Sequence, residues 1–276
     1  MDVTAVPHNA AANEPDSQRF QREVGEISAG TRHLFETYSH IPPDEVTKHI
    51  TTVRDKAWAI HPYPCIGRWR FLDLGLGLHR CYPDVLARLK TGGQTFLDLG
   101  CAFAQDIRRL AADGVDSTKL YACDLRLDFL DLGYELFRDK ESLKATFFEA
   151  DVFAEGGPLD QYEGHFDIIQ ASSFFHLFDR EHQKRVAHRV VKLLKPQKGS
   201  LLLGRQMGSW EPTESPWRNG YGKHFRHNEA SWQELWNEVG EEAGGVKFEV
   251  KASLRERPGE VGLLAGPWLV YTVERL

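Results

Sequence analysis

Three aspartates stand at the ends of three apolar segments in this chain of 276 residues. Asp98 lies in TFLDLG, Asp124 in KLYACDL and Asp151 in ATFFEAD, so that 26 and then 27 residues separate them. Each segment is typical of a buried parallel strand, and the carboxyl ends of such strands meet at one edge of a sheet. Carboxylates there can accept hydrogen bonds from the hydroxyl groups of a nucleoside. The spacing therefore predicts a nucleoside-binding edge.

The phrase FLDLG occurs twice, at residues 71–75 and 96–100. The first copy continues as FLDLGLG and has the better glycine pattern, whereas the second continues as FLDLGCAFAQD. Counting strands from the second copy gives seven, but counting from the first gives eight, with one helix too many in front. We therefore assign the binding turn to the second copy and interpret the first as a packing segment whose similarity arises by chance.

The elements predicted around these aspartates alternate between strand and helix. The predicted strands cover residues 95–100, 119–125, 145–151, 166–172, 200–207, 246–252 and 268–274. Five alternate with helices, and the last two form a hairpin at one edge. The predicted fold is α/β, a Rossmann-like, seven-stranded, mostly parallel sheet with an antiparallel C-terminal hairpin, helices on both faces and an N-terminal helical cap. Residues 1–25 are predicted to be a disordered tail, 26–94 the cap and 95–276 the sheet domain.

Composition restricts the classes of partner. The net charge is −6 and no basic run exceeds a few residues, which argues against nucleic acid. No apolar run approaches the roughly 20 residues of a membrane span, so membrane insertion is not expected. The four cysteines form no CxxC pair, which favours a reducing cytoplasm without a bound metal. We expect a small-molecule partner.

With this register, residues from about 60 to 276 resemble the class I S-adenosylmethionine-dependent methyltransferases. Their first strand ends in an acidic-x-Gly-x-Gly-x-Gly turn, and alanine replaces the second and third glycines in the present turn. The resemblance implies S-adenosylmethionine as the cofactor. Asp98 would contact its ammonium group, and the turn at Gly100, Cys101 and Ala102 would face its methionine part. Asp124 would accept hydrogen bonds from both ribose hydroxyls.

The same resemblance assigns the rest of the nucleoside. Asp151 would bind the adenine amino group and the Val152 amide a ring nitrogen, while Leu125 and Val152 would enclose the ring. Ser172 would lie near the methionine end. His176 is a candidate for an orienting group or a general base, because imidazole titrates near neutral pH. The alternative is that His176 simply packs against the sheet.

In this fold the acceptor is selected by the cap and by the segment after the fifth strand. Here that segment is rich in tryptophan, arginine and histidine, which can surround a bulky apolar acceptor and pair with an anionic or oxygen-rich end. For any single residue the alternative is an exposed, solvated side chain. The candidate acceptor-binding residues are Tyr38, Trp69, Arg205, Gln206, Trp217, Arg218, His224 and Arg226.

The whole chain is more closely similar to fungal methyltransferases that methylate a carboxyl group of farnesylated polyketide (meroterpenoid) intermediates. The segments that carry this likeness are HIPPDEVTKHITTVRDKAWAIHPYPCIGRWRFLDLGL, TFLDLGCAFAQDIRRLAADG and LYACDLRLDFLDLGYELF. The resemblance implies methyl ester formation on a carboxylate, with a homodimer as a possible assembly.

Three other functions stay open. The acceptor could be a phenol or another hydroxyl group, in which case a base is needed. The fold could also bind the cofactor without methyl transfer, or act as a pericyclase. A nicotinamide-dependent oxidoreductase is disfavoured because the turn lacks GxGxxG and no Tyr-x-x-x-Lys pair follows the fourth strand.

Overall fold

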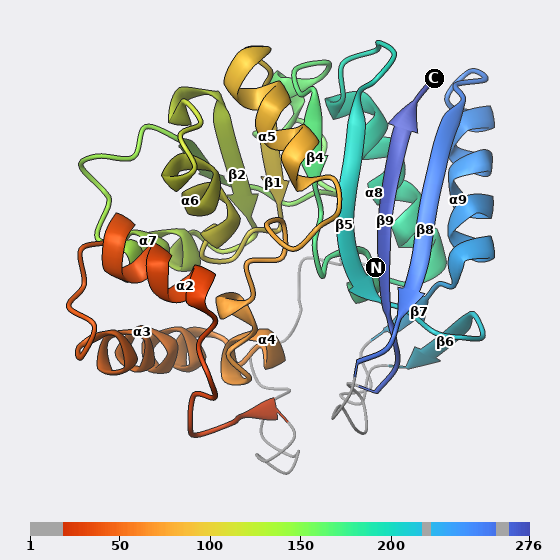
Figure 1. Cartoon of the computed structure of the whole chain (residues 1–276). Helices are drawn as coiled ribbons and strands as arrows, with labels where there is room; N and C mark the ends of the chain where they lie inside the picture. Colours follow the sequence, from red (N-terminus) through yellow and green to blue (C-terminus); the bar gives the residue numbers. More distant parts are fainter. Residues whose placement is uncertain (1–18, 217–221, 258–264) are drawn as a thin grey trace.

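The computed structural model describes residues 19–216, 222–257 and 265–276. Its main sheet has seven strands in the order β3-β2-β1-β4-β5-β9-β8, with helices on both faces (Figure 1). The five strands from β3 to β5 run parallel, whereas β9 is antiparallel to both β5 and β8. The predicted fold class is confirmed. The strands are β1 (Phe96–Leu99), β2 (Leu120–Asp124), β3 (Thr146–Glu149), β4 (Ile168–Gln170), β5 (Leu201–Met207), β8 (Phe248–Arg255) and β9 (Trp268–Arg275).

Alternate side chains of the central strands enter two different cores. Leu97 and Leu202 pack with the apolar faces of α8 and α9, while Phe96 and Leu203 pack with α5 and α6. This double burial explains why these strands are apolar without strict alternation. The sheet-domain helices are α5 (Tyr82–Thr91), α6 (Gln105–Ala112), α7 (Leu127–Phe137), α8 (Arg180–Leu193) and α9 (Glu229–Glu242).

A second, two-stranded sheet was not predicted. β6 (Thr213–Pro216) pairs antiparallel with β7 (Lys223–Arg226) inside the segment after β5. The backbone amide of Phe225 donates to the carbonyl of Phe178, 2.9 Å away, which fixes β7 beside the turn after β4. This segment is therefore tied to the sheet domain through β7.

The cap consists of short helices around its own apolar cluster. Its elements are α2 (Ala29–His33), the π-helical turn η1 (Leu34–Tyr38), α3 (Val46–Ile60), α4 (Pro64–Gly67) and the 3-10 turn η2 (Arg70–Leu72). Val46, Ile50 and Val53 form the buried stripe of α3, at the spacing expected of an amphipathic helix.

The cap also holds the end of the predicted tail. The guanidinium of Arg54 lies over the rings of Phe20 and Trp69, with its carbon 4.2 and 4.1 Å from their centroids. It donates a hydrogen bond of 3.0 Å to the carbonyl oxygen of Gln21. Residues 19–21 are thus packed rather than free, which differs from the predicted tail; residues 1–18 lie outside the described part of the chain.

The first FLDLG copy is a packing segment of η2 and turns, and no strand forms there. Its Asp73 accepts a hydrogen bond of 3.2 Å from Arg205 of β5, and the Leu76 amide donates one of 3.2 Å to Asp106 of α6. The segment therefore connects the cap to two elements of the sheet domain.

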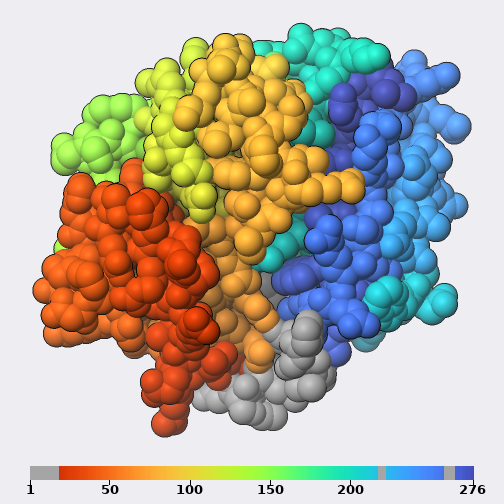
Figure 2. Space-filling model, viewed as in Figure 1, coloured from red at the N-terminus to blue at the C-terminus, as the bar shows by residue number. Residues whose placement is uncertain are grey.

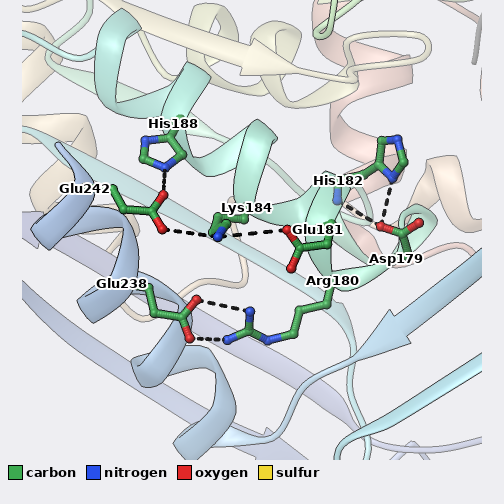
Figure 3. A network of polar contacts seen from close by, with 8 residues as sticks. All are labelled: Asp179, Arg180, Glu181, His182, Lys184, His188, Glu238 and Glu242. Atoms are coloured by element: carbon green, nitrogen blue, oxygen red, sulfur yellow. Dashed lines mark hydrogen bonds and ion pairs between the residues drawn. The ribbon is translucent and has the colours of Figure 1, made fainter.

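Helices α8 and α9 are joined by ion pairs on the outer surface (Figure 3). Arg180 donates to both carboxylate oxygens of Glu238, at 3.1 and 2.6 Å, and Glu242 accepts from Lys184 and His188. These pairs are partly exposed, so each contributes little to stability. They fix the helix register beneath the sheet. Nowhere in the described ranges is a helix both long and apolar enough to cross a membrane.

Candidate active site

The turn after β1 keeps a glycine-like backbone even where alanine replaces glycine. Gly100 has φ +74°, and a Cβ atom there would lie 2.3 Å from the Phe174 ring. Ala102 and Ala104 have φ values of 49° and 51°, in the left-handed region that costs an L-residue about 1–2 kcal/mol. The turn of the second FLDLG copy therefore retains the shape that the motif requires, at the expense of strain in the two alanines.

Asp124 lies beside this turn, at the carboxyl end of β2. One carboxylate oxygen accepts from the Ala102 amide at 2.8 Å and the other from the Arg126 amide at 3.1 Å. Burial raises the pKa of Asp124, while these backbone amides oppose the rise. Each oxygen keeps further lone-pair capacity, so the carboxylate can also accept from hydroxyl groups.

A buried pair of carboxyl groups lies on the other side of the turn. The side-chain amide of Gln170 donates to Asp98 at 3.3 Å and to Asp106 at 2.8 Å. Burial, followed by the charge of Asp106, raises the pKa of Asp98 well above its usual range. Burial also raises the pKa of Asp106 to about 6.

The sequence prediction named Asp98 and placed residues 170–173 near the methionine end, but it missed Asp106 and the hydrogen bonds from Gln170 to both carboxyl groups. The QD of GCAFAQD places Asp106 at the start of a helix, where an acidic side chain is ordinarily a surface feature. Only the pairing of β1 with β4 brings Gln170 opposite Asp98.

The predicted adenine-binding residues lie at the ends of β2 and β3. Asp151 accepts from the Phe153 amide at 2.9 Å, as a turn-capping carboxylate does. Leu125 is half exposed and Val152 is buried. An exposed Leu125 offers an apolar surface near Asp124, and the role of these residues in binding adenine stays a prediction.

His176 is buried in η5 (Phe175–Leu177), immediately after β4. Burial and the charges of Arg226, His224 and Arg257 lower the pKa of His176 to about 3. Its imidazole is therefore neutral at physiological pH. A base with so low a pKa accepts a proton poorly at the pH where the protein works.

Guanidinium groups from β5, from the ends of β7 and β8 and from the cap gather near Trp268, the first residue of β9. Arg205 and Arg257 lie over the ring of Trp268, with their guanidinium carbons 4.8 and 4.0 Å from the centroid. Burial, followed by the charges of the four arginines Arg70, Arg205, Arg226 and Arg68, lowers the pKa of Arg257 to about 10. A site with this charge is suited to an anion.

The structure divides the remaining acceptor candidates into three groups. Gln206 and His224 are buried, and neither side-chain oxygen nor nitrogen of Gln206 has a hydrogen-bond partner within the described segments. Tyr38 donates to Asp139 at 2.9 Å, and Trp69 is buried in the cap with its indole N–H donating to the Gln21 carbonyl; a role of either residue in acceptor binding stays a prediction. Trp217 and Arg218 lie outside the described residues.

The chemistry of this edge fits S-adenosylmethionine. The Phe174 ring packs against Gly100 and leaves no room for a side chain there, and the carboxyl groups of Asp98 and Asp124 lie near the same turn. One carboxylate suits an ammonium group and the other suits vicinal hydroxyls. Asp98 lies on β1 beside β4, where the strand order reverses, and Asp124 ends β2, the neighbour of β1 on the other side.

Comparison with known proteins agrees with this architecture. Residues 19–72 match the family model "Meroterpenoid methyltransferase N-terminal domain", and residues 96–197 match a methyltransferase domain model. The chain is similar in fold to a Burkholderia thailandensis 1,6-didemethyltoxoflavin-N1-methyltransferase bound to S-adenosylhomocysteine. That likeness has a TM-score of 0.53 and 16% identity, over 83% of this chain and 89% of that one. Fold and site thus define a class I S-adenosylmethionine-dependent methyltransferase.

Two curated fungal proteins are much closer in sequence. The O-methyltransferase phiE of Fungal sp. (strain ATCC 74256) is 43% identical, over 98% of this chain and 94% of the relative. The Asnovolin E/Chermesin D methyltransferase nvfJ of Aspergillus novofumigatus is 38% identical, over 80% of each. The chain belongs to this family of fungal meroterpenoid methyltransferases, and it is an S-adenosylmethionine-dependent O-methyltransferase.

Proposed function

We propose that the acceptor is a carboxylate of a farnesylated polyketide (meroterpenoid) intermediate, which the enzyme converts into a methyl ester. The observation that carries this proposal is the group of Arg68, Arg70, Arg205, Arg226 and Arg257 near Trp268, because guanidinium groups gathered in this way suit an anionic ligand. The match of residues 19–72 to a meroterpenoid methyltransferase N-terminal domain supports the meroterpenoid class.

A carboxylate acceptor also agrees with the state of His176. A carboxylate is already ionised at neutral pH and attacks a sulfonium methyl group without losing a proton first. The bound cofactor supplies that methyl group. The tasks left to the protein are to orient the acid and to exclude water, and orientation alone can supply about 7–11 kcal/mol of the barrier. A phenol would need a base, and His176, with a pKa near 3, is a poor one.

The test is to offer the protein S-adenosylmethionine with a prenylated polyketide acid and with the matching phenol that lacks the carboxyl group. We expect a mass gain of one methyl group on the acid only. Mild alkali should return the starting acid, because it cleaves an ester but leaves an aryl methyl ether intact. An alkali-stable product, or methylation of the phenol alone, would replace the carboxylate with a hydroxyl acceptor.

A substitution in the protein, His176→Ala, also distinguishes a carboxylate acceptor from a phenol acceptor. We expect kcat for the acid to fall less than about fivefold, because no proton transfer to His176 is required. A loss of 100-fold or more, rescued at high pH, would identify His176 as the base of a phenol methyltransferase. Affinity for S-adenosylhomocysteine, measured by calorimetry, shows whether the site is intact in the variant.

A further inference from the structure

A cavity of about 130 Å³ lies against the face of the sheet, beside the cofactor turn. One wall is the continuation of the first FLDLG copy, including Leu76 and Arg80, and the floor comes from β5 and β9, including Leu203 and Val270. In Figure 1 α5 crosses in front of β1, whereas the front of β5, β9 and β8 is left open. Figure 2 shows the segment around residue 75 beside β8 and β9, with part of β5 visible between them. We call this space the sheet-face cavity.

The sheet-face cavity is continuous with the cofactor turn. Gln170 lines it and donates to Asp98 at 3.3 Å, and Ser172 lines it two residues further on. The sheet-face cavity is also lined by Trp268 and by Arg205, an arginine of the proposed carboxylate site that lies over the Trp268 ring. A ligand whose carboxylate is bound by these arginines could therefore extend directly into the sheet-face cavity, because Arg205 lines both.

The lining has one apolar and one cationic part. Leu203 and Val270 offer apolar side chains from the sheet, and Leu76 faces them from the cap segment. Arg80 and Arg255 stand at the exposed rim. Neither of these two arginines forms an ion pair with another described residue, so both guanidiniums are available to a ligand oxygen.

Strand register explains this composition. Arg255 is paired with Trp268 and Ser253 with Val270, so Arg255, Trp268 and Val270 share one face of the sheet, together with Arg205 opposite Val270. The sequence alone did not predict this cavity. Residues 255 and 268 lie on different strands, and residues 76–80 follow the first FLDLG copy, which we did not assign to the cofactor.

We infer that the sheet-face cavity is an acceptor subsite: its apolar floor holds a hydrocarbon part of the substrate, and Arg80 and Arg255 bind an oxygen-bearing group away from the reacting carboxylate. This inference rests on the proposed function, because it names where that acid is held. At about 130 Å³ the cavity is smaller than the ~300–1,000 Å³ of a whole ligand site, so it accepts a portion of the acceptor only.

The test uses Arg255→Ala, Arg255→Lys and Val270→Phe, with Lys251→Ala as the matched control. Lys251 lies on the same strand and the same face but does not line the cavity. We expect Arg255→Ala to raise the KM for the acid at least fivefold, Arg255→Lys to recover part of that loss, and Val270→Phe to reduce kcat/KM more for a bulky acid than for a truncated one. The Kd for S-adenosylhomocysteine should stay within twofold of wild type.

Two results would overturn the subsite. The first is a KM in Arg255→Ala and Val270→Phe that equals that of Lys251→Ala. The second is a weakened Kd for S-adenosylhomocysteine with an unchanged acceptor KM, which would assign the cavity to the cofactor. If the wild-type enzyme esterifies no acid, the proposed function fails instead. Calorimetric binding of the same acids to wild type and Val270→Phe then tests the subsite, and equal affinities would refute it.

Discussion

At the scale of single residues, the unusual feature is the buried pair Asp98 and Asp106. Burial raises the pKa of both carboxyl groups, the charge of Asp106 raises the pKa of Asp98 further, and the hydrogen bonds from Gln170 oppose the rise. The ammonium group of S-adenosylmethionine is the natural partner for the charge that Asp98 would carry. Burial favours the protonated form of Asp98 in the free protein, and a nearby ammonium group would favour its ionised form.

The raised pKa of Asp106 predicts a pH-dependent stability. In the unfolded chain this carboxyl ionises near pH 4, whereas in the folded protein it stays protonated up to about pH 6. Raising the pH through that window therefore favours the unfolded state, and stability falls by about 1–3 kcal/mol. Below pH 4 the full stability is present, and above pH 6 the loss is complete.

The comparison of wild type with Asp106→Asn isolates this effect, because asparagine keeps an oxygen for the Leu76 amide but does not titrate. Between pH 4 and pH 6 we expect the unfolding free energy of wild type, measured by urea denaturation, to fall relative to that of Asp106→Asn. Parallel curves across that window would show that Asp106 does not titrate there.

Asp124→Ala should weaken S-adenosylhomocysteine binding about 10- to 100-fold, since two hydrogen bonds to a charged acceptor are lost. Calorimetry measures this directly. Asp128→Ala, an exposed aspartate at the start of α7, is the control and should change the Kd less than twofold. Unchanged affinity in Asp124→Ala would refute the assignment of the second FLDLG copy as the cofactor turn.

At the scale of elements, the turn after β1 shows that a motif can lose its glycines and keep its backbone. Ala102 and Ala104 adopt left-handed φ values because the hydrogen bonds around them impose that path, notably the one from the Ala102 amide to Asp124. GCAFAQD is thus a strained version of the glycine-rich turn.

Two substitutions in the turn should have opposite effects. Gly100→Ala should destabilise the protein by about 2 kcal/mol or more, since the added Cβ meets the Phe174 ring at 2.3 Å. Ala102→Gly should be neutral or stabilising by up to about 1 kcal/mol, because glycine adopts φ 49° without strain. Urea denaturation measures both, and a stability loss above about 1 kcal/mol in Ala102→Gly would show that the alanine methyl group packs usefully.

At the scale of the whole molecule, the cap and the sheet domain are joined by polar contacts at both ends of the interface. Tyr38 reaches Asp139, which forms a buried ion pair with Arg108 of α6, and Asp73 reaches Arg205 of β5. The cap is therefore part of one packed unit with the cofactor turn and the arginine group.

The assembly and its cellular place stay predictions: a homodimer, in the cytoplasm. Light scattering after size exclusion should give twice the chain mass of 31.5 kDa at micromolar concentration. A mass of 31.5 kDa that persists on concentration would establish a monomer.

Hydrophobic pattern and strand-end acids were sufficient to predict the sheet, its hairpin and the choice between the two FLDLG copies. They were sufficient because the strands are buried on both faces and each ends in a turn residue. The same reasoning placed Tyr38 and Trp69 at the acceptor site, which stays a prediction, because the sequence does not distinguish an aromatic side chain that binds a ligand from one that fills a core. It could not predict the β6–β7 ribbon, whose strands are short and polar.

The sequence by itself determined which strands form and which family the chain resembles, and it predicted where the cofactor turn lies, because those properties depend on local periodicity and on spacing along the chain. Only the tertiary structure decided the partners of Asp98, the neutral state of His176 and the cavity under the first FLDLG copy. Each of these depends on burial and on groups brought together across strands: Gln170 and Asp106 at Asp98, arginines from β5 and from residue 257 at Trp268. The distances between such groups follow from strand order and cannot be read from their separation in the chain.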